Sequence, residues 1–226
     1  MRPITTLFLL CSVDGKISTG SADILDFDRD LPFINGVKEG LQQYYDIEAT
    51  TDIWSLCSGR TKAKIGYNRM KELPDKTDVN HVIIDNDHLD YWGVKNLCAE
   101  ANRLIVVTTN KEHPAFSIKA ENLSTLIQSE LDLKLALESL HKYYECDRLT
   151  IQSGGTLNKK FLSADLVDFV DIVIAPVIIG GKDTPTLVDG DSLTEISQLK
   201  ELKALKLIDM QRLEESYVRL RYEVIR

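Results

Sequence analysis

The chain has 226 residues, of which 43% are hydrophobic and 27% charged, so a sizeable globular core is expected rather than disorder. Its 35 acidic and 27 basic residues give a formal net charge of -8, which argues against broad attraction to nucleic acid or an anionic membrane. A small-molecule partner is favoured instead. No linker rich in Pro, Gly or Ser divides the sequence, which predicts one domain over residues 1–226.

Cysteine and histidine usage gives neither a disulfide framework nor a metal motif. The four cysteines form no C-x-x-C pair and are interpreted as reduced core thiols: Cys11, Cys57, Cys98 and Cys146. The four histidines show no H-x-x-x-H spacing, so no metal is expected. The first residues resemble neither a signal peptide nor a membrane span of ~20 apolar residues, so a cytoplasmic protein is expected.

The first half of the chain alternates apolar runs of strand length with segments of helical spacing. Pro32 stands at an early helical position, and the run Asp52–Cys57 ends at Ser58 and Gly59. The predicted elements are a strand over Pro3–Leu10, a helix over Leu31–Tyr45, a strand over Asp52–Cys57, and a helix over Arg60–Leu73.

The second half continues the alternation and then changes character after Leu166. The predicted strands are Val79–Asp85, Arg103–Thr109, Arg148–Gln152 and Phe169–Pro176, with helices over Leu89–Ala101, Leu131–Tyr144 and Leu157–Asp165. Two final strands, Leu205–Leu213 and Ser216–Arg226, are joined by a short turn around Glu214 and Glu215, which predicts an antiparallel hairpin. The order predicts an α/β fold with a mixed, mostly parallel sheet.

Two junctions run from a strand through glycine into a helix. They are Ser58-Gly59-Arg60-Thr61 and Ser153-Gly154-Gly155-Thr156. Glycines let backbone N–H groups approach an anion, and the helix that follows offers unpaired donors and a partial positive charge. A tight turn without a ligand is the alternative. The chain contains neither G-x-G-x-x-G nor G-x-x-x-x-G-K-[ST], so the usual nucleotide folds are disfavoured.

Charged residues beside these turns are the other candidates for chemistry. Arg60 carries a planar fork of donors that suits a phosphate monoester such as the adenosine 2′-phosphate of NADPH, although an exposed arginine at a helix start is the plain alternative. In the turn Asp14-Gly15-Lys16, Lys16 is a candidate for binding an anionic substrate or for proton donation. An ordinary surface turn is the alternative there.

Three blocks, in this order, resemble the dihydrofolate-reductase-like superfamily, and in particular the reductase domain of riboflavin biosynthesis. The first is Ser12-Val13-Asp14-Gly15-Lys16-Ile17 after an apolar strand. The second is the strand ending in Ser58-Gly59-Arg60-Thr61. The third runs from Ile151-Gln152-Ser153-Gly154-Gly155-Thr156-Leu157 to Ile174-Ala175-Pro176-Val177-Ile178-Ile179-Gly180-Gly181 and is the most specific.

The resemblance implies a three-layer α/β/α fold, NADPH as cofactor and a homodimer. It implies hydride transfer to a small heterocyclic or ribosylaminopyrimidine-phosphate-like substrate. The cofactor contacts that it implies are Gly59, Arg60, Thr61, Ser153, Gly154, Gly155, Thr156, Leu157, Pro176 and Ile178. Lys16 and Asp14 are implied on the substrate side, Lys16 for phosphate binding or proton delivery and Asp14 for orienting it.

Two positions depart from the family pattern. The segment Lys62–Asn68 stands where an acidic D-[DN]-P element is common, and neutral Gln152 replaces an acid before the glycines. The alternatives are therefore a noncatalytic NADP-binding module of the same fold and a dihydrofolate-reductase-type enzyme. Substrate-dependent oxidation of NADPH distinguishes an enzyme from a pure binder.

Overall fold

Nine strands, six α-helices and five short 3-10 helices make up the computed structural model, which describes residues 1–226. The chain divides into two units. The first unit is Met1–Ile4 with Asp52–Ser153, and the second is Thr5–Thr51 with Gly154–Arg226. The single domain expected from the sequence stays a prediction.

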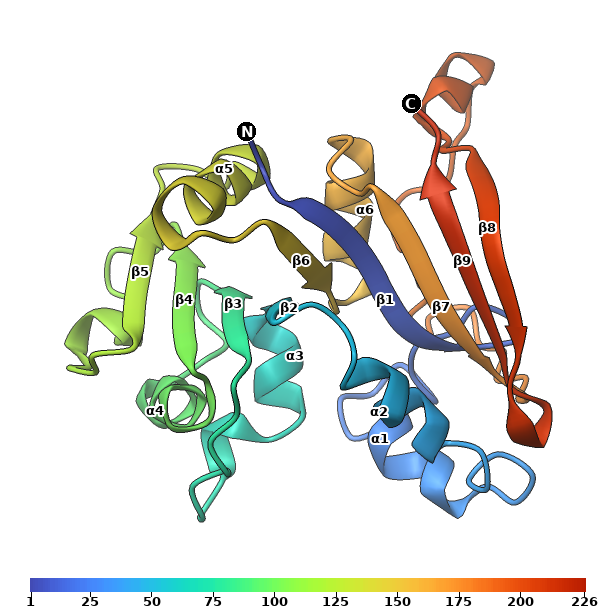
Figure 1. Cartoon of the computed structure of the whole chain (residues 1–226), viewed down its shortest axis with the longest axis horizontal. Coiled ribbons are helices and arrows are strands. Elements are labelled where there is room, and N and C mark those ends of the chain that lie inside the picture. The colour runs from blue at the N-terminus through green and yellow to red at the C-terminus, as the bar shows by residue number, and fades with distance from the viewer. The chain divides into compact units, whose positions relative to one another are not determined.

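The first unit contains a fully parallel sheet in the strand order β5-β4-β3-β2-β6 (Figure 1). The strands are β2 (Trp54–Ser58), β3 (Asn80–Ile84), β4 (Arg103–Thr108), β5 (Leu123–Ile127) and β6 (Arg148–Ile151). The helices are α3 (Gly59–Lys64), η2 (Tyr67–Arg69), α4 (Tyr91–Glu100), η3 (Pro114–Ser117) and α5 (Leu133–Tyr144). Parallel strands bring all their carboxyl ends to one edge, where open α/β sheets bind ligands.

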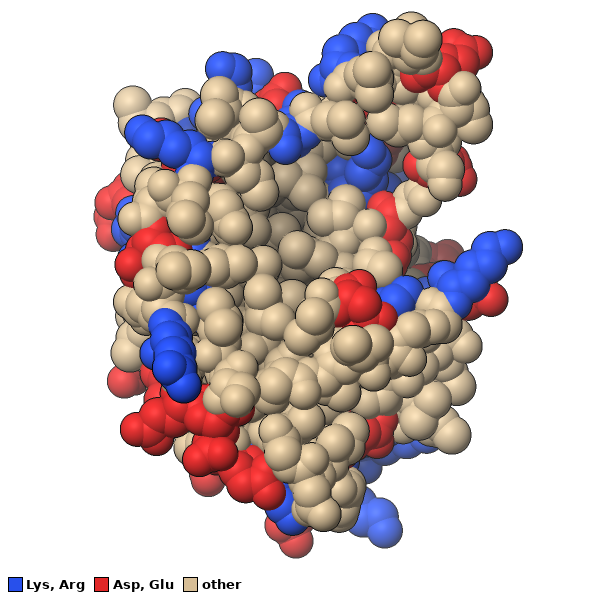
Figure 2. Space-filling view, turned by 90° about the vertical axis from the view of Figure 1, so that its right-hand side faces the viewer, with Lys and Arg blue, Asp and Glu red and all other residues tan.

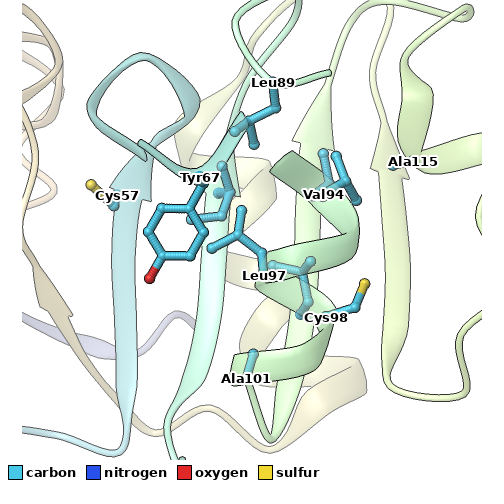
Figure 3. Close-up of a cluster of buried hydrophobic side chains, with 11 residues drawn as sticks. Cys57, Tyr67, Leu89, Val94, Leu97, Cys98, Ala101 and Ala115 are labelled. Atoms are coloured by element: carbon cyan, nitrogen blue, oxygen red, sulfur yellow. The ribbon is translucent and has the colours of Figure 1, made fainter. Parts of the chain in front are cut away.

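The core of the first unit lies between α4 and the central strands (Figure 3). Val94 and Leu97 of α4 pack with Ile83 and Leu104, all fully buried. Tyr67 joins this cluster and its hydroxyl donates to the carboxylate of Glu100. Because β3 and β4 are buried on both faces, they are continuous apolar runs rather than alternating ones, which is why the sequence predicted them well.

The second unit has the strand order β1-β7-β9-β8, in which β1 and β7 are parallel and the last two pairings are antiparallel. The strands are β1 (Ile4–Ser12), β7 (Phe169–Ala175), β8 (Leu205–Arg212) and β9 (Val218–Val224). The helices are α1 (Phe27–Asp30), η1 (Leu31–Phe33), α2 (Gln42–Glu48), α6 (Gly155–Ser163), η4 (Ile196–Glu201) and η5 (Glu214–Ser216). The predicted α/β class and C-terminal hairpin are confirmed.

A second core cluster joins β1 and β7 to the segment around α1 and α2. Phe8 stacks on Tyr44 with ring centroids 5.3 Å apart, and fully buried Tyr217 donates its hydroxyl to the carbonyl of Val37. The outer strand β8, by contrast, exposes large apolar side chains, including Leu207 and Met210. Figure 2 shows the β8–β9 side, where residues other than Lys, Arg, Asp and Glu cover much of the surface.

Two predicted helices are wrong in extent. The segment Leu31–Tyr45 forms only η1 and the start of α2, because Gly36 adopts a left-handed φ of 82° and interrupts the helix. The helix predicted over Arg60–Leu73 ends at Lys64, because Gly66 adopts a left-handed φ of 112° two residues later. Glycine takes such angles at little cost, so it ends helices that side-chain spacing alone would extend.

The other predicted strands and helices agree with the structure to within two residues at each end. Strand β5 (Leu123–Ile127) was missed, because the polar residues Ser124 and Thr125 interrupt its short apolar run and it is only partly buried. All four cysteines are buried free thiols, as predicted. Burial raises the pKa of Cys11 to about 11, which keeps it a thiol at neutral pH. No helix of the structure has the length and apolar character needed to cross a membrane.

Candidate functional site

The junction from β2 into α3 is built around a buried carboxylate. Ser58 caps α3, because its hydroxyl accepts from the N–H of Thr61 at 3.2 Å. Gly59 lies directly against Asp85, which follows β3: a Cβ on Gly59 would stand 2.2 Å from the carboxyl carbon of Asp85. Contacts that short do not occur between real atoms, so the glycine is required by the protein itself at this position.

Asp85 is held by four donors within the first unit. Its carboxylate contacts Nε2 of His113 at 3.1 Å and Nδ1 of His88 at 3.0 Å, and it accepts the N–H groups of Leu89 and His88. Burial by itself raises the pKa of Asp85, but the hydrogen bonds from His113 and the two backbone amides outweigh it and lower that pKa. The Asp85 carboxylate is therefore ionised and held in a fixed position against Gly59, at the start of α3.

A cavity of about 170 Å³ opens beside this junction. Arg60 of α3 and the segment that follows β3 line it. Its full lining is Ser58, Arg60, Ile84, Asp85, Asn86, Asp87, His88, Val107 and Leu131. Of these residues, Arg60 was predicted from the sequence, whereas the Asp85–His88 segment was not. The available signal was its position at the carboxyl end of a buried strand.

The end of β6 lies at the same edge of the first unit's sheet as the end of β2, since Ser55 pairs with Thr150 and Leu56 with Ile151 in parallel register. Gln152 follows, and its side-chain oxygen accepts the Ser55 hydroxyl at 2.9 Å. Ser153 is buried. The side-chain oxygen of neutral Gln152 is thus satisfied by the hydroxyl of Ser55 on the neighbouring strand β2.

The helix that follows, α6, begins at Gly155 with no side-chain cap. A Cβ on Gly155 would stand 2.4 Å from the carbonyl oxygen of Thr186 and 2.5 Å from the carboxylate of Asp189, so close packing requires this glycine. Gly154 is different: no atom of the chain lies within 4 Å of where its Cβ would be, and its φ of -70° suits any residue. The uncapped start of α6 is therefore open to an approaching group.

The Asp14-Gly15-Lys16 turn is fastened to the segment after β7. Gly15 and Ile17 exchange backbone hydrogen bonds with Leu187 and Pro185, at 3.0 Å each. This pairing, centred on Lys16 opposite Thr186, fixes the turn within the second unit. The same segment packs on Gly155 through Thr186, so the turn and the start of α6 share one support.

Both candidate side chains of this turn bind backbone groups. The Asp14 carboxylate accepts from the Ser12 hydroxyl and from the N–H groups of Gly180 and Ile179. The Ser12 and Gly180 hydrogen bonds lower the pKa of Asp14 to about 2. The Lys16 ammonium donates to the carbonyls of Gly181 and Thr184, at 2.7 and 3.0 Å. An ammonium has three protons, so one is left for a ligand.

Of the two residues implied near the nicotinamide, Ile178 is unusual because its large apolar side chain is exposed. Its neighbours Val177 and Ile179 pack against the second core cluster, whereas Ile178 is 76% exposed. Pro176 is partly buried at the end of β7. A large apolar side chain presented beside the Asp14–Lys16 turn offers a surface for a flat ring.

The structure groups the candidate residues by unit. Gly59, Arg60, Thr61 and Ser153 lie at the carboxyl edge of the first unit's sheet. The second unit brings together the start of α6 and the Asp14–Lys16 turn, through the segment Pro185–Asp189. Thr156 is exposed and Leu157 half-buried in the first turn of α6.

Comparison with known proteins defines the class. A dihydrofolate reductase from Enterococcus faecalis, described as complexed with NADP(H), has the same fold with a TM-score of 0.51 at 14% identity, covering 100% of this chain and 99% of that one. Acinetobacter baumannii RibD matches with a TM-score of 0.69 at 19% identity over 100% of this chain. This chain spans 59% of that RibD chain. The fold is thus dihydrofolate-reductase-like.

The RibD C-terminal domain model matches residues 3–218, and the chain belongs to that family. A relative from Methanothermobacter thermautotrophicus is 29% identical over 210 residues, which are 90% of this chain and 91% of the relative. That relative is named 2,5-diamino-6-ribosylamino-4(3H)-pyrimidinone 5′-phosphate reductase. The family resemblance stated from the sequence, and the reductase class that it implied, are confirmed.

Proposed function

We propose that this protein is a reductase that transfers a hydride from a nicotinamide dinucleotide to a C=N or C=O bond of a ribosylaminopyrimidine 5′-phosphate. The observation that carries the proposal is the uncapped start of α6, where Gly154 leaves space that nothing in the chain fills. Backbone N–H groups at a helix start bind phosphate well, and a glycine lets them approach it. The substrate class follows the name of the relative from Methanothermobacter thermautotrophicus.

Each junction would contribute cofactor contacts within its own unit. Gly154, Gly155 and Thr156 supply donors for the diphosphate, with Ser153 and Leu157 beside them. Gly59, Arg60 and Thr61 contribute at the start of α3, where Arg60 is the residue suited to the 2′-phosphate of NADPH. When bound, the cofactor supplies the hydride, and the chain supplies binding, orientation and electrostatics. Ile178 and Pro176 would cover a face of the nicotinamide ring.

The substrate side belongs to the Asp14–Lys16 turn. Lys16 is positioned by two carbonyls, and its remaining proton would bind the substrate phosphate or be delivered to the atom that gains negative charge as the hydride arrives. Asp14 would orient Lys16 indirectly, since its carboxylate holds the Ile179–Gly180 backbone next to the Gly181 carbonyl that Lys16 binds. Asp14 is thus proposed as a positioning residue.

The test is oxidation of NADPH in the presence of 2,5-diamino-6-ribosylamino-4(3H)-pyrimidinone 5′-phosphate, followed by the loss of nicotinamide absorbance. Turnover that depends on this substrate is expected. Binding of NADPH without turnover would instead support a noncatalytic dinucleotide-binding module. Turnover of dihydrofolate in place of the pyrimidinone would support the dihydrofolate-reductase alternative.

Lys16→Ala is expected to reduce kcat/KM for the phosphorylated substrate by about 10²-fold or more, the range of a lost general acid or charged contact. Dinucleotide binding, measured by quenching of Trp fluorescence, should change much less. Lys182→Ala, an exposed lysine in the same segment, is the control and should behave as the native protein. Unchanged turnover in Lys16→Ala would remove Lys16 from the reaction.

The homodimer and the cytoplasmic location expected from the sequence remain proposals. The apolar side chains exposed on β8 are the kind of surface that a subunit contact would cover.

A further inference from the structure

The cavity beside α3 has the right chemistry for the adenosine end of a dinucleotide, an inference that rests on the proposed function. Its walls are apolar where Val107, Leu131 and Ile84 line it, and its rim is polar. The cavity volume is about 170 Å³. That is room for one flat ring system with its attached sugar at the rim, rather than for a whole dinucleotide.

The rim is fixed by hydrogen bonds that leave defined groups for a ligand. The Asn86 side-chain oxygen accepts from Thr108 and from the N–H of Thr109, which leaves its amide N–H₂ as a donor. Asp87 follows, with its carboxylate 3.1 Å from Nδ1 of His88 and its side chain 78% exposed. An amide donor and an exposed carboxylate are partners that the hydroxyl groups of a ribose can use.

The cavity is lined by charges of both signs, with the carboxylates of Asp85 and Asp87 against the guanidinium of Arg60. The carboxylate of Asp85 is buried and already accepts from His113, Leu89 and His88, so it is not available to a ligand. The other charged side chains that line the cavity are Arg60 and Asp87, with His88 beside Asp87. A phosphate monoester on the ribose would meet an attractive guanidinium and a repulsive carboxylate in the same cavity.

We propose that Asp87 is a specificity-determining residue for the cofactor, which accepts a hydrogen bond from the 2′-hydroxyl of the adenosine ribose and opposes a phosphate in that position. Arg60 acts in the opposite direction. The native protein therefore discriminates weakly between NADPH and NADH. Neutralising Asp87 raises the affinity for NADPH relative to NADH, and removing the charge of Arg60 lowers it.

The experiment measures the dissociation constants of NADPH and NADH by quenching of Trp fluorescence, for the native protein and for Asp87→Asn and Arg60→Ala. The affinity ratio of NADPH over NADH should rise about tenfold in Asp87→Asn, an effect limited by the exposure of this carboxylate. It should fall in Arg60→Ala. High salt should reduce both changes, because exposed charges are screened.

Asp78→Asn is the matched control, because Asp78 is an exposed aspartate before β3 whereas Asp87 follows that strand. Its affinity ratio should equal the native one. A rise of less than about threefold in Asp87→Asn, or a native ratio above about a hundred, would overturn the assignment of Asp87 while leaving the reductase proposal intact. Failure of both dinucleotides to bind the native protein would remove both proposals.

Discussion

Gly155→Ala is expected to destabilise the second unit and to abolish reductase activity. Gly154→Ala should leave stability unchanged and weaken only the binding of the dinucleotide. A Cβ at position 155 would stand 2.4 Å from the Thr186 carbonyl, which is backbone and cannot rotate away. Relieving that contact requires α6 or the Pro185–Asp189 segment to move. The Asp14–Lys16 turn is paired with this segment and would move with it.

The size of the two effects can be estimated. Overpacking of this kind costs about 1–3 kcal/mol. For a chain of this length each kcal/mol lowers Tm by about 2–4 °C. At position 154 an alanine meets no atom within 4 Å and has a favourable φ, so Tm should be native. Its methyl group instead occupies the space proposed for the phosphate.

Thermal unfolding and fluorescence titration with NADPH separate the two outcomes. Gly154→Ala should bind NADPH at least tenfold more weakly, since backbone donors at a helix start act only at close range. If Gly154→Ala binds NADPH as the native protein does, the diphosphate does not lie at the start of α6. If Gly155→Ala keeps the native Tm, the packing described for Thr186 and Asp189 is wrong.

Asp85→Asn should destabilise the protein by about 3 kcal/mol, because an amide cannot accept all the hydrogen bonds that the buried carboxylate accepts. In either orientation the amide N–H₂ group would face donors: the N–H of Leu89 and the ring of His113 at one position, or the N–H of His88 at the other. Asp87→Asn, two residues later in the same segment and exposed, should change stability by less than about 0.5 kcal/mol. Urea unfolding of the two variants provides the comparison.

The effect of Asp85→Asn should also depend on pH in a defined direction. The folded-state pKa of Asp85 is lowered, so its ionised form adds stability above the unfolded-state pKa of about 3.9. That contribution is lost as pH falls from about 4 through the folded-state value. The difference in stability between the native protein and Asp85→Asn should therefore be full at neutral pH and shrink in acid. A difference that grows on acidification would contradict the hydrogen bonding described for Asp85.

The sequence predicted a helix or strand well where a single pattern of apolar residues determines which of the two forms. The apolar runs of β3 and β4 and the amphipathic spacing of α5 were sufficient to identify them. The segment Leu31–Tyr45 has helical spacing too, but Gly36 interrupts the helix and the chain after it packs through a tertiary contact. Gly40 packs within 2.6 Å of the Tyr217 ring, measured from where a Cβ would be, and no local pattern predicts that partner.

The candidate site was predictable to a similar extent. Strand-to-glycine junctions and the Asp14–Lys16 turn stand out in the sequence, because glycine and charged turn residues have direct physical meaning there. The role of Asp85 could not be predicted, since it depends on His113, 28 residues away, and on the space beside Gly59. The different roles of Gly154 and Gly155 also become visible only when their neighbours are known.

The division of the chain has a consequence for how the protein is made. The first unit is nearly continuous in sequence, so it can fold once residues up to 153 have been synthesised. In the second unit, Thr6 of β1 pairs with Phe169 of β7, 163 residues later. At ~5–20 residues per second, a ribosome needs about 8–33 s to add those residues. Throughout that interval the apolar strand β1 lacks its partner β7, which exposes it to aggregation during synthesis.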